Sequence, residues 1–238
     1  MMKAWRTLLC KIESWLLDVL FPSRVCCLVC GERTGGDMLC GDCRAGLDAL
    51  RLSGPMCSRC GAETGGGRRC VCHELDPAIT AARSVWRYSG SAAALVRRLK
   101  LSCVSDTSCV LADGLAEAAR SMRLPENTII TSVAMPPRRK RQRGIDHGAM
   151  LAQMTAERLG LPYQQLLIRL NGGHTQRGLG REERLRNLEG CFQAAEQHGA
   201  PVLLVDDVLT TGATASVCAR ALKAGGSGDV YVLTATRA

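Results

Sequence analysis

Apolar residues follow two kinds of pattern along most of the chain. Short runs rich in β-branched residues indicate buried strands, and apolar residues at helical spacing indicate amphipathic helices. We expect strands over 82–88, 128–134, 202–205 and 229–236, and helices over 90–101, 106–122, 146–159 and 215–222. Because strands alternate with helices, the sequence predicts an α/β domain over residues 77–238, with a mainly parallel sheet flanked by helices.

The N-terminal residues also follow helical spacing. Apolar side chains recur between Trp5 and Leu20, and charged residues interrupt any continuous apolar run. The pattern predicts an amphipathic helix over 1–22, and neither a secretory signal nor a membrane-spanning helix. We expect this helix to pack on the protein's own core. The alternative is that it docks on a partner or a membrane surface through Trp5 and Trp15.

Cysteines are concentrated in one segment, which we expect to form a small domain over 23–76. Nine of the 14 fall between Cys26 and Cys72, and with no secretion signal they favour metal binding in a reducing cytoplasm over disulfides. Two Cys-x2-Cys-Gly turns, thirty residues apart, predict a double zinc ribbon with one or two structural Zn²⁺ ions. The expected ligands are Cys27, Cys30, Cys40 and Cys43 in the first site, and Cys57, Cys60, Cys70 and Cys72 in the second. A strict shift of thirty residues leaves His73 as the alternative to Cys72.

The stretch from Val202 to Ala215 contains the most specific chemistry. Four apolar residues lead into Asp206 and Asp207, and a turn rich in Thr and Gly precedes the next helix. Backbone N–H groups at a helix start bind phosphate, and adjacent carboxylates accept hydrogen bonds from ribose hydroxyls or hold Mg²⁺ through water. The sequence therefore predicts a ribose 5-phosphate site with a divalent ion, although capping of the helix alone is the simpler alternative. The expected phosphate-binding residues are Thr210, Thr211, Gly212, Ala213 and Thr214.

A basic loop follows the strand expected over 128–134. Two prolines are followed by five basic residues in six positions, which are Arg138, Arg139, Lys140, Arg141 and Arg143. Because parallel strands share their ligand-facing edge, we expect the loop near Asp206, where it would neutralise a pyrophosphate leaving group. The alternative is a solvated basic loop. The net charge of +9 also favours an anionic partner, either phosphate groups or nucleic acid.

Residues 169–192 are polar and rich in glycine, and we expect them to cover the sugar site as a hood. The expected hood residues are Thr175, Gln176, Arg184 and Asn187. His147 or His174 could serve as a base toward an acceptor, although surface histidines without a role are the simpler interpretation.

These features together resemble a known family. Residues 202–215 resemble the phosphoribosyl-diphosphate (PRPP) motif of type I phosphoribosyltransferases. The whole order resembles the ComF family of competence-associated phosphoribosyltransferase-like proteins. The features that carry this resemblance are the N-terminal helix, the Cys-rich ribbon, the strand at Tyr88, the helix end at Lys100, the Arg-rich loop, the Thr-Gln-x2-Leu-x4-Arg-x2-Asn-x4-Phe run and the PRPP motif. The chain departs from that family after the basic loop, where Arg143-Gly-Ile-Asp-His147 replaces the usual Arg-Gly-Phe-Asn-Gln.

The resemblance implies a type I phosphoribosyltransferase fold that binds PRPP with Mg²⁺. Asp206 and Asp207 would stabilise the positive charge that builds on the ribose as pyrophosphate leaves. It further implies transfer of the phosphoribosyl group to an acceptor that the sequence does not identify. It also implies a cytoplasmic role in DNA uptake, with single-stranded DNA and the uptake machinery as partners. The alternative is a non-catalytic protein that handles DNA or acts as a scaffold and retains the pocket. The scarcity of aromatic residues weighs against a strong stacking platform for single strands.

Overall fold

The computed structural model describes residues 26–65, 70, 72, 75–101, 104–137, 139, 141, 144–170, 188–196 and 199–238. The helix expected over 1–22 lies outside the described residues. The same holds for several of the expected site residues, namely His73, Arg138, Lys140, Arg143, His174, Thr175, Gln176, Arg184 and Asn187.

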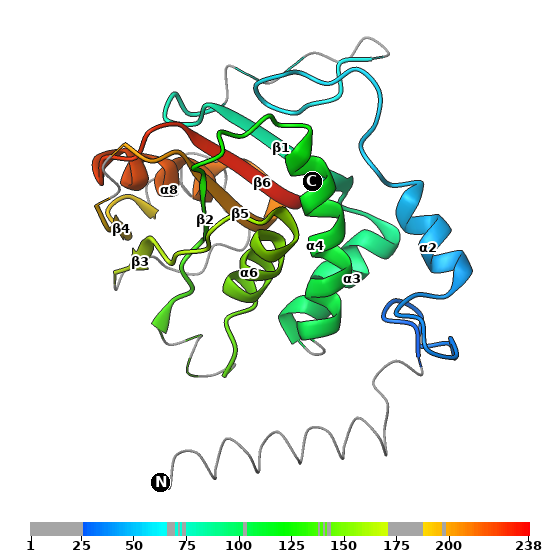
Figure 1. The fold of residues 1–238 in the computed structure, drawn as a ribbon. Coiled ribbons are helices and arrows are strands. Elements are labelled where there is room, and N and C mark those ends of the chain that lie inside the picture. The colour runs from blue at the N-terminus through cyan, green and yellow to red at the C-terminus, as the bar shows by residue number, and fades with distance from the viewer. Residues whose placement is uncertain are drawn as a thin grey trace, which may run out of the picture.

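A four-stranded parallel sheet forms the centre of the molecule (Figure 1). Its strands lie in the order β1 (Ala81–Arg87), β6 (Val230–Arg237), β5 (Val202–Leu209) and β2 (Ile129–Ser132). The apolar run in β5 is buried on both faces, because alternate side chains enter separate hydrophobic clusters on the two sides of the sheet. The α/β fold class predicted from the sequence is therefore confirmed.

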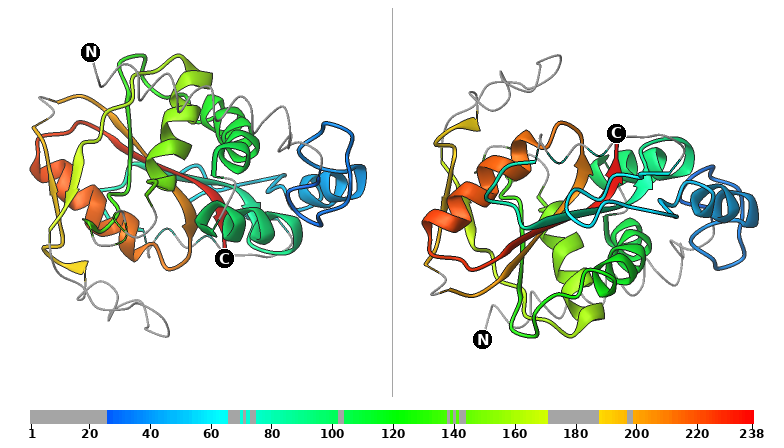
Figure 2. Two further views of the ribbon diagram at one scale, coloured as in Figure 1. Left: turned by 90° about the horizontal axis from the view of Figure 1, so that it is seen from below. Right: turned by 90° about the horizontal axis from the view of Figure 1, so that it is seen from above.

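Helices cover both faces of this sheet. On one face, α4 (Val104–Arg120) packs on β1 and β6, and α6 (His147–Leu159) packs on β2 and β5, while α8 (Ala213–Ala224) covers the other face (Figure 2). The helix α3 (Gly90–Leu101) packs beside α4, and α2 (Gly41–Asp48) packs beside α3. Within the described ranges, no helix has the length and apolar character needed to cross a bilayer.

The chain that follows α6 returns beside β2. Ile130 N donates to the Pro162 carbonyl over 2.8 Å, and Gln164 N donates to the Ile130 carbonyl over 2.9 Å, so this segment runs parallel to β2. It continues into β3 (Leu167–Arg169), which pairs antiparallel with β4 (Phe192–Ala194). The expected hood therefore begins and ends at this strand pair.

The Cys-rich segment contains two copies of one backbone turn. In the first copy Gly31 N donates to the Cys27 carbonyl over 3.0 Å, and in the second Gly61 N donates to the Cys57 carbonyl over 3.1 Å. Both glycines have positive φ, at 83° and 64°, a conformation that glycine adopts without steric cost. The thirty-residue repeat in the sequence is thus also a repeat of backbone hydrogen bonds.

The second turn lies directly on the edge of the sheet. Ala82 N donates to the Arg59 carbonyl over 2.6 Å, and Arg237 Nη1 donates to the Cys60 carbonyl over 2.7 Å. A Cβ atom at Gly61 would lie 2.5 Å from the Ala82 carbonyl oxygen, so a larger residue would push the turn away from β1.

Candidate functional site

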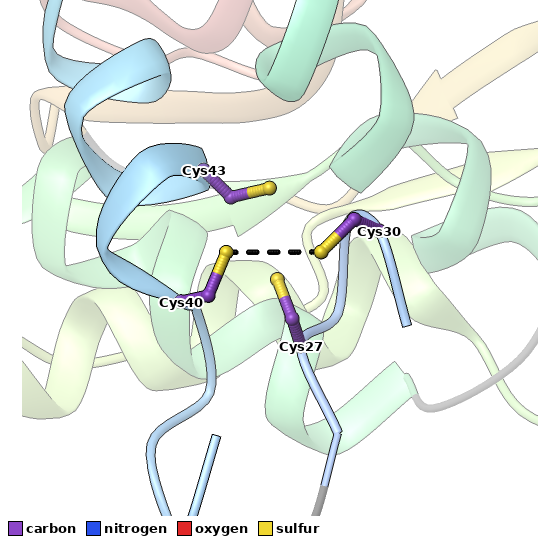
Figure 3. Close-up of side chains that lie close together, drawn as sticks. All are labelled: Cys27, Cys30, Cys40 and Cys43. Atoms are coloured by element: carbon purple, nitrogen blue, oxygen red, sulfur yellow. Dashed lines mark hydrogen bonds between the residues drawn. The ribbon is translucent and has the colours of Figure 1, made fainter. Parts of the chain in front are cut away.

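The first cysteine cluster brings four sulfur atoms together from two elements. The Sγ atoms of Cys27, Cys30, Cys40 and Cys43 all lie within 4.8 Å of one another (Figure 3). Cys27 and Cys30 come from the first turn, whereas Cys40 is the N-cap of α2 and Cys43 lies in its first turn. A Zn–S distance of about 2.3 Å places the sulfurs of a tetrahedral site about 3.8 Å apart. The Sγ atoms of Cys30 and Cys40 are 3.7 Å apart, so the cluster fits structural zinc.

The second cluster consists of Cys57, Cys60, Cys70 and Cys72, whose Sγ atoms also lie within 4.8 Å of one another. The Sγ atoms of Cys57 and Cys72 are 3.1 Å apart. The backbone N–H of Cys60 and the thiol of Cys72 lower the pKa of Cys57 to about 6, which favours the thiolate that a metal binds. Cys72 thus occupies the last position of the cluster, and this cluster also fits structural zinc.

The acid pair lies within β5, which is longer than the apolar run predicts. β2 ends at Ser132, opposite Val205, but the backbone of β5 continues to pair with β6 as far as Leu209. Asp206 and Asp207 therefore lie where β5 has lost its neighbour on one side. The strand expected over 202–205 is therefore too short, because backbone pairing continues after the apolar side chains stop, and the acids lie in the carboxyl half of β5.

Lys100 contacts this acid pair from a different element. Its Nζ atom, in the last turn of α3, lies 2.8 Å from Asp207 Oδ2. An Asp206 carboxylate oxygen accepts a hydrogen bond from Asp207 N over 2.9 Å. Burial raises the pKa of Asp206 to about 7, the charge of Asp207 adds to this rise, and the charge of Lys100 opposes it. Asp207 is therefore ion-paired, whereas the surroundings of Asp206 favour its protonated form.

The sequence did not single out Lys100 as part of the site. The family resemblance names it only at the end of the helix over 90–101, where Arg97 and Arg98 are equally basic. Only the packing of α3 beside the sheet selects Lys100 for contact with the acids.

The turn between β5 and α8 is capped by a left-handed glycine. Gly212 is the N-cap of α8 with φ at 73°, and Thr211 Oγ1 accepts from Ala213 N over 3.4 Å. The first N–H groups of a helix have no partner within the helix, and the helix dipole makes this end positive. The expected phosphate-binding residues thus surround the amino end of a helix of 12 residues.

The basic loop leaves the sheet at the same edge as the acid pair, because β2 and β5 are parallel. Within this segment, Arg139 and Arg141 are helical and exposed, whereas the sequence predicts a loop here. Asp146 follows the loop and caps α6, since its Oδ1 atom accepts from Ala149 N over 3.1 Å. Asp and Asn both cap helices well, so the acid at this position is accounted for as a helix cap. His147 is partly buried and lies in the first turn of α6.

Residues 16–74 match a family model described as a double zinc ribbon domain. A DNA utilization protein YhgH of Salmonella typhi is 32% identical over 167 residues, which cover 68% of this chain and 74% of that protein. Competence protein F of Haemophilus influenzae is 31% identical over 128 residues, covering 52% of this chain and 55% of that protein. The YhgH protein of Escherichia coli K12 is 29% identical over 215 residues, or 87% of each chain.

Solved structures with a similar arrangement include phosphoribosyltransferases. Adenine phosphoribosyltransferase of Leishmania tarentolae matches with a TM-score of 0.33 and 18% identity, covering 56% of this chain and 71% of that chain. A hypoxanthine phosphoribosyltransferase of Staphylococcus aureus matches with a TM-score of 0.34 and 13% identity, covering 53% of this chain and 61% of that chain.

Proposed function

From the premise that this chain belongs to the ComF family of competence-associated proteins, we propose that it binds PRPP with Mg²⁺ at the carboxyl edge of its parallel sheet. One observation carries the proposal. The acid pair near the carboxyl end of β5 and the glycine-capped amino end of α8 are separated only by residues 208–211. A ribose 5-phosphate can satisfy both groups with one small molecule. Its hydroxyls can donate hydrogen bonds to the acids, and its phosphate dianion can bind at the amino end of the helix.

Each part of PRPP would meet a group of matching chemistry. The 5-phosphate binds at residues 211–214, the ribose hydroxyls donate to Asp206 and Asp207, and the diphosphate faces the arginines of the basic loop. Mg²⁺ prefers oxygen ligands, so an ion on the diphosphate is attracted toward the acid pair. Departure of the diphosphate builds positive charge on the ribose, which the two carboxylates would stabilise. We therefore include transfer of the phosphoribosyl group to an acceptor in the proposal.

Calorimetric titration of the zinc-loaded protein with PRPP, with and without Mg²⁺, tests this function. We expect Mg²⁺-dependent binding that is lost when Asp206→Asn and Asp207→Asn are combined. Asp229→Asn is the matched control, because Asp229 lies just before β6 at the opposite edge of the same sheet. Equal affinity in the double variant and the wild type would overturn the assignment of the site.

A second candidate function is the binding of single-stranded DNA. It is favoured by the net charge of +9 and by the names of the relatives, which refer to DNA utilization and competence. Electrostatic binding of DNA phosphates weakens steeply as salt rises. We expect the affinity for an oligonucleotide to fall with salt, and to fall further when Arg139 and Arg141 are both changed to Ala. A response that is flat with salt would exclude this function.

A further inference from the structure

Lys100 brings a positive charge to the acid pair from outside the sheet. Its Nζ atom lies 2.8 Å from Asp207 Oδ2, and only 13% of the Asp207 side chain is exposed. A carboxylate that is largely removed from water is costly without an opposite charge beside it. Among the described residues, Lys100 is the ion-pair partner of Asp207. Its ammonium therefore takes a position that a cation bound to this carboxylate would need.

The end of α3 that carries Lys100 is held in place by the core. Leu99 is completely buried, and it belongs to the same hydrophobic cluster as Leu28 of the first cysteine turn and Val205 of β5. Arg98 Nη1 also donates to the Leu28 carbonyl over 3.3 Å. The backbone of Lys100 is thus fixed relative to β5, so the ion pair requires the ordering of one side chain and not of a loop.

A lysine in this position changes which ions the acids attract. Carboxylate oxygens are ligands that Mg²⁺ and Mn²⁺ prefer, but Lys100 neutralises one carboxylate and its charge repels a divalent ion nearby. We propose that Lys100 is a built-in counter-ion of Asp207, which keeps a free divalent cation from binding at the acid pair until a ligand displaces the ammonium. That PRPP is the displacing ligand rests on the proposed function, whereas the exclusion of free cations rests on the ion pair.

Binding of Mn²⁺ alone to the zinc-loaded protein tests the counter-ion, with the free ion measured by electron paramagnetic resonance. Mn²⁺ prefers oxygen ligands, so it leaves the cysteine clusters to zinc. We expect Lys100→Gln to bind Mn²⁺ at least about tenfold more tightly than the wild type, because a unit charge about 5 Å from a divalent ion repels it even at the dielectric constant of water. Lys100 is partly exposed and glutamine is a good helix former, so this variant should fold.

Three further variants show whether the effect comes from this ion pair. Lys100→Arg keeps the charge and should bind Mn²⁺ as weakly as the wild type. Arg123→Gln removes the same net charge at the opposite edge of the sheet, where exposed Arg123 precedes β2, and should also leave the affinity unchanged. The site gained in Lys100→Gln should be lost again when Asp207→Asn is added, which would locate that site at this carboxylate.

A separate titration with PRPP and Mg²⁺ distinguishes failure of the counter-ion from failure of the proposed function. Equal Mn²⁺ affinity in Lys100→Gln and the wild type, or no Mn²⁺ binding by either, would overturn the counter-ion. If the wild type still binds PRPP in that case, the proposed function stays intact. Tighter binding of Mn²⁺ by Lys100→Gln at a site that needs Asp207, in a protein that does not bind PRPP, would support the counter-ion and overturn the proposed function.

Discussion

At the scale of single residues, the two acids near the carboxyl end of β5 have different surroundings. Burial and the charge of Asp207 raise the pKa of Asp206 from its ordinary 3.8 to about 7, so the folded state binds this proton more tightly than the unfolded state. The resulting stability is fully present below about pH 4 and is lost as pH rises toward 7. An ionised Asp206 is therefore a cost to the folded protein, and a function at this position would explain why the acid is present.

Asp206→Asn should remove this pH dependence, because the amide stays neutral at every pH. We expect the variant to gain stability relative to the wild type between pH 5 and pH 8, by on the order of 1–3 kcal/mol, since one pKa unit corresponds to about 1.4 kcal/mol. Urea unfolding at the two pH values measures the difference. If the free energies of unfolding of variant and wild type differ by the same amount at pH 5 and at pH 8, the pKa of Asp206 is not raised.

Lys100→Gln should move this titration to higher pH, because the charge of Lys100 opposes the rise in the pKa of Asp206. The titration midpoint of Asp206 in this background is measured by comparing two proteins across pH, the Lys100→Gln variant and the double variant Lys100→Gln with Asp206→Asn. The difference between their free energies of unfolding changes with pH as Asp206 titrates. Lys100→Arg keeps the charge and should leave the midpoint near that of the wild type. Loss of the partly exposed ion pair itself should cost less than about 1 kcal/mol. An unshifted midpoint in Lys100→Gln would argue against contact between α3 and the acids in solution.

At the scale of elements, Asp146 links the basic loop to α6. Its carboxylate accepts from Ala149 N, and removal of such a cap costs about 1 kcal/mol. We expect Asp146→Ala to lower the free energy of unfolding by that amount and Asp146→Asn to leave it almost unchanged, as measured by urea denaturation. Equal destabilisation by both changes would show that the negative charge, and not the cap, is what matters.

The sequence predicted elements well where side-chain pattern and backbone pairing agree. The helix expected over 90–101 has the bounds of α3, because apolar spacing covers the whole element. β5 was predicted four residues too short, since its pairing with β6 continues through the two acids. The pairing of β3 with β4 was not predicted, because three-residue strands are too short to show a period. The contact of Lys100 with Asp207 joins distant segments, and no local pattern contains it.

At the scale of the whole molecule, both cysteine clusters are attached to the α/β domain. The second cluster is bonded to the sheet through Arg237 and the Cys60 carbonyl. The first lies against α3, where Arg98 Nη1 donates to the Leu28 carbonyl over 3.3 Å, and Leu28 belongs to the same hydrophobic cluster as Leu99. Because α3 also carries Lys100, loss of metal should affect more than the ribbons themselves.

Removal of zinc should therefore destabilise the α/β domain as well as the ribbons. We expect the wild type to bind two zinc ions. The double variant Cys27→Ser with Cys40→Ser should bind one zinc ion, and so should the double variant Cys57→Ser with Cys60→Ser. Each double variant should melt several degrees below the wild type in a single calorimetric transition, because binding of structural zinc contributes directly to folding. Cys26→Ser is the control, since Cys26 is exposed and lies outside both clusters. Full zinc content in a double variant would refute that cluster as a metal site. An unchanged melting transition of the α/β domain would refute the coupling between zinc binding and the stability of that domain, because the ribbons would then fold independently of the sheet on which they lie.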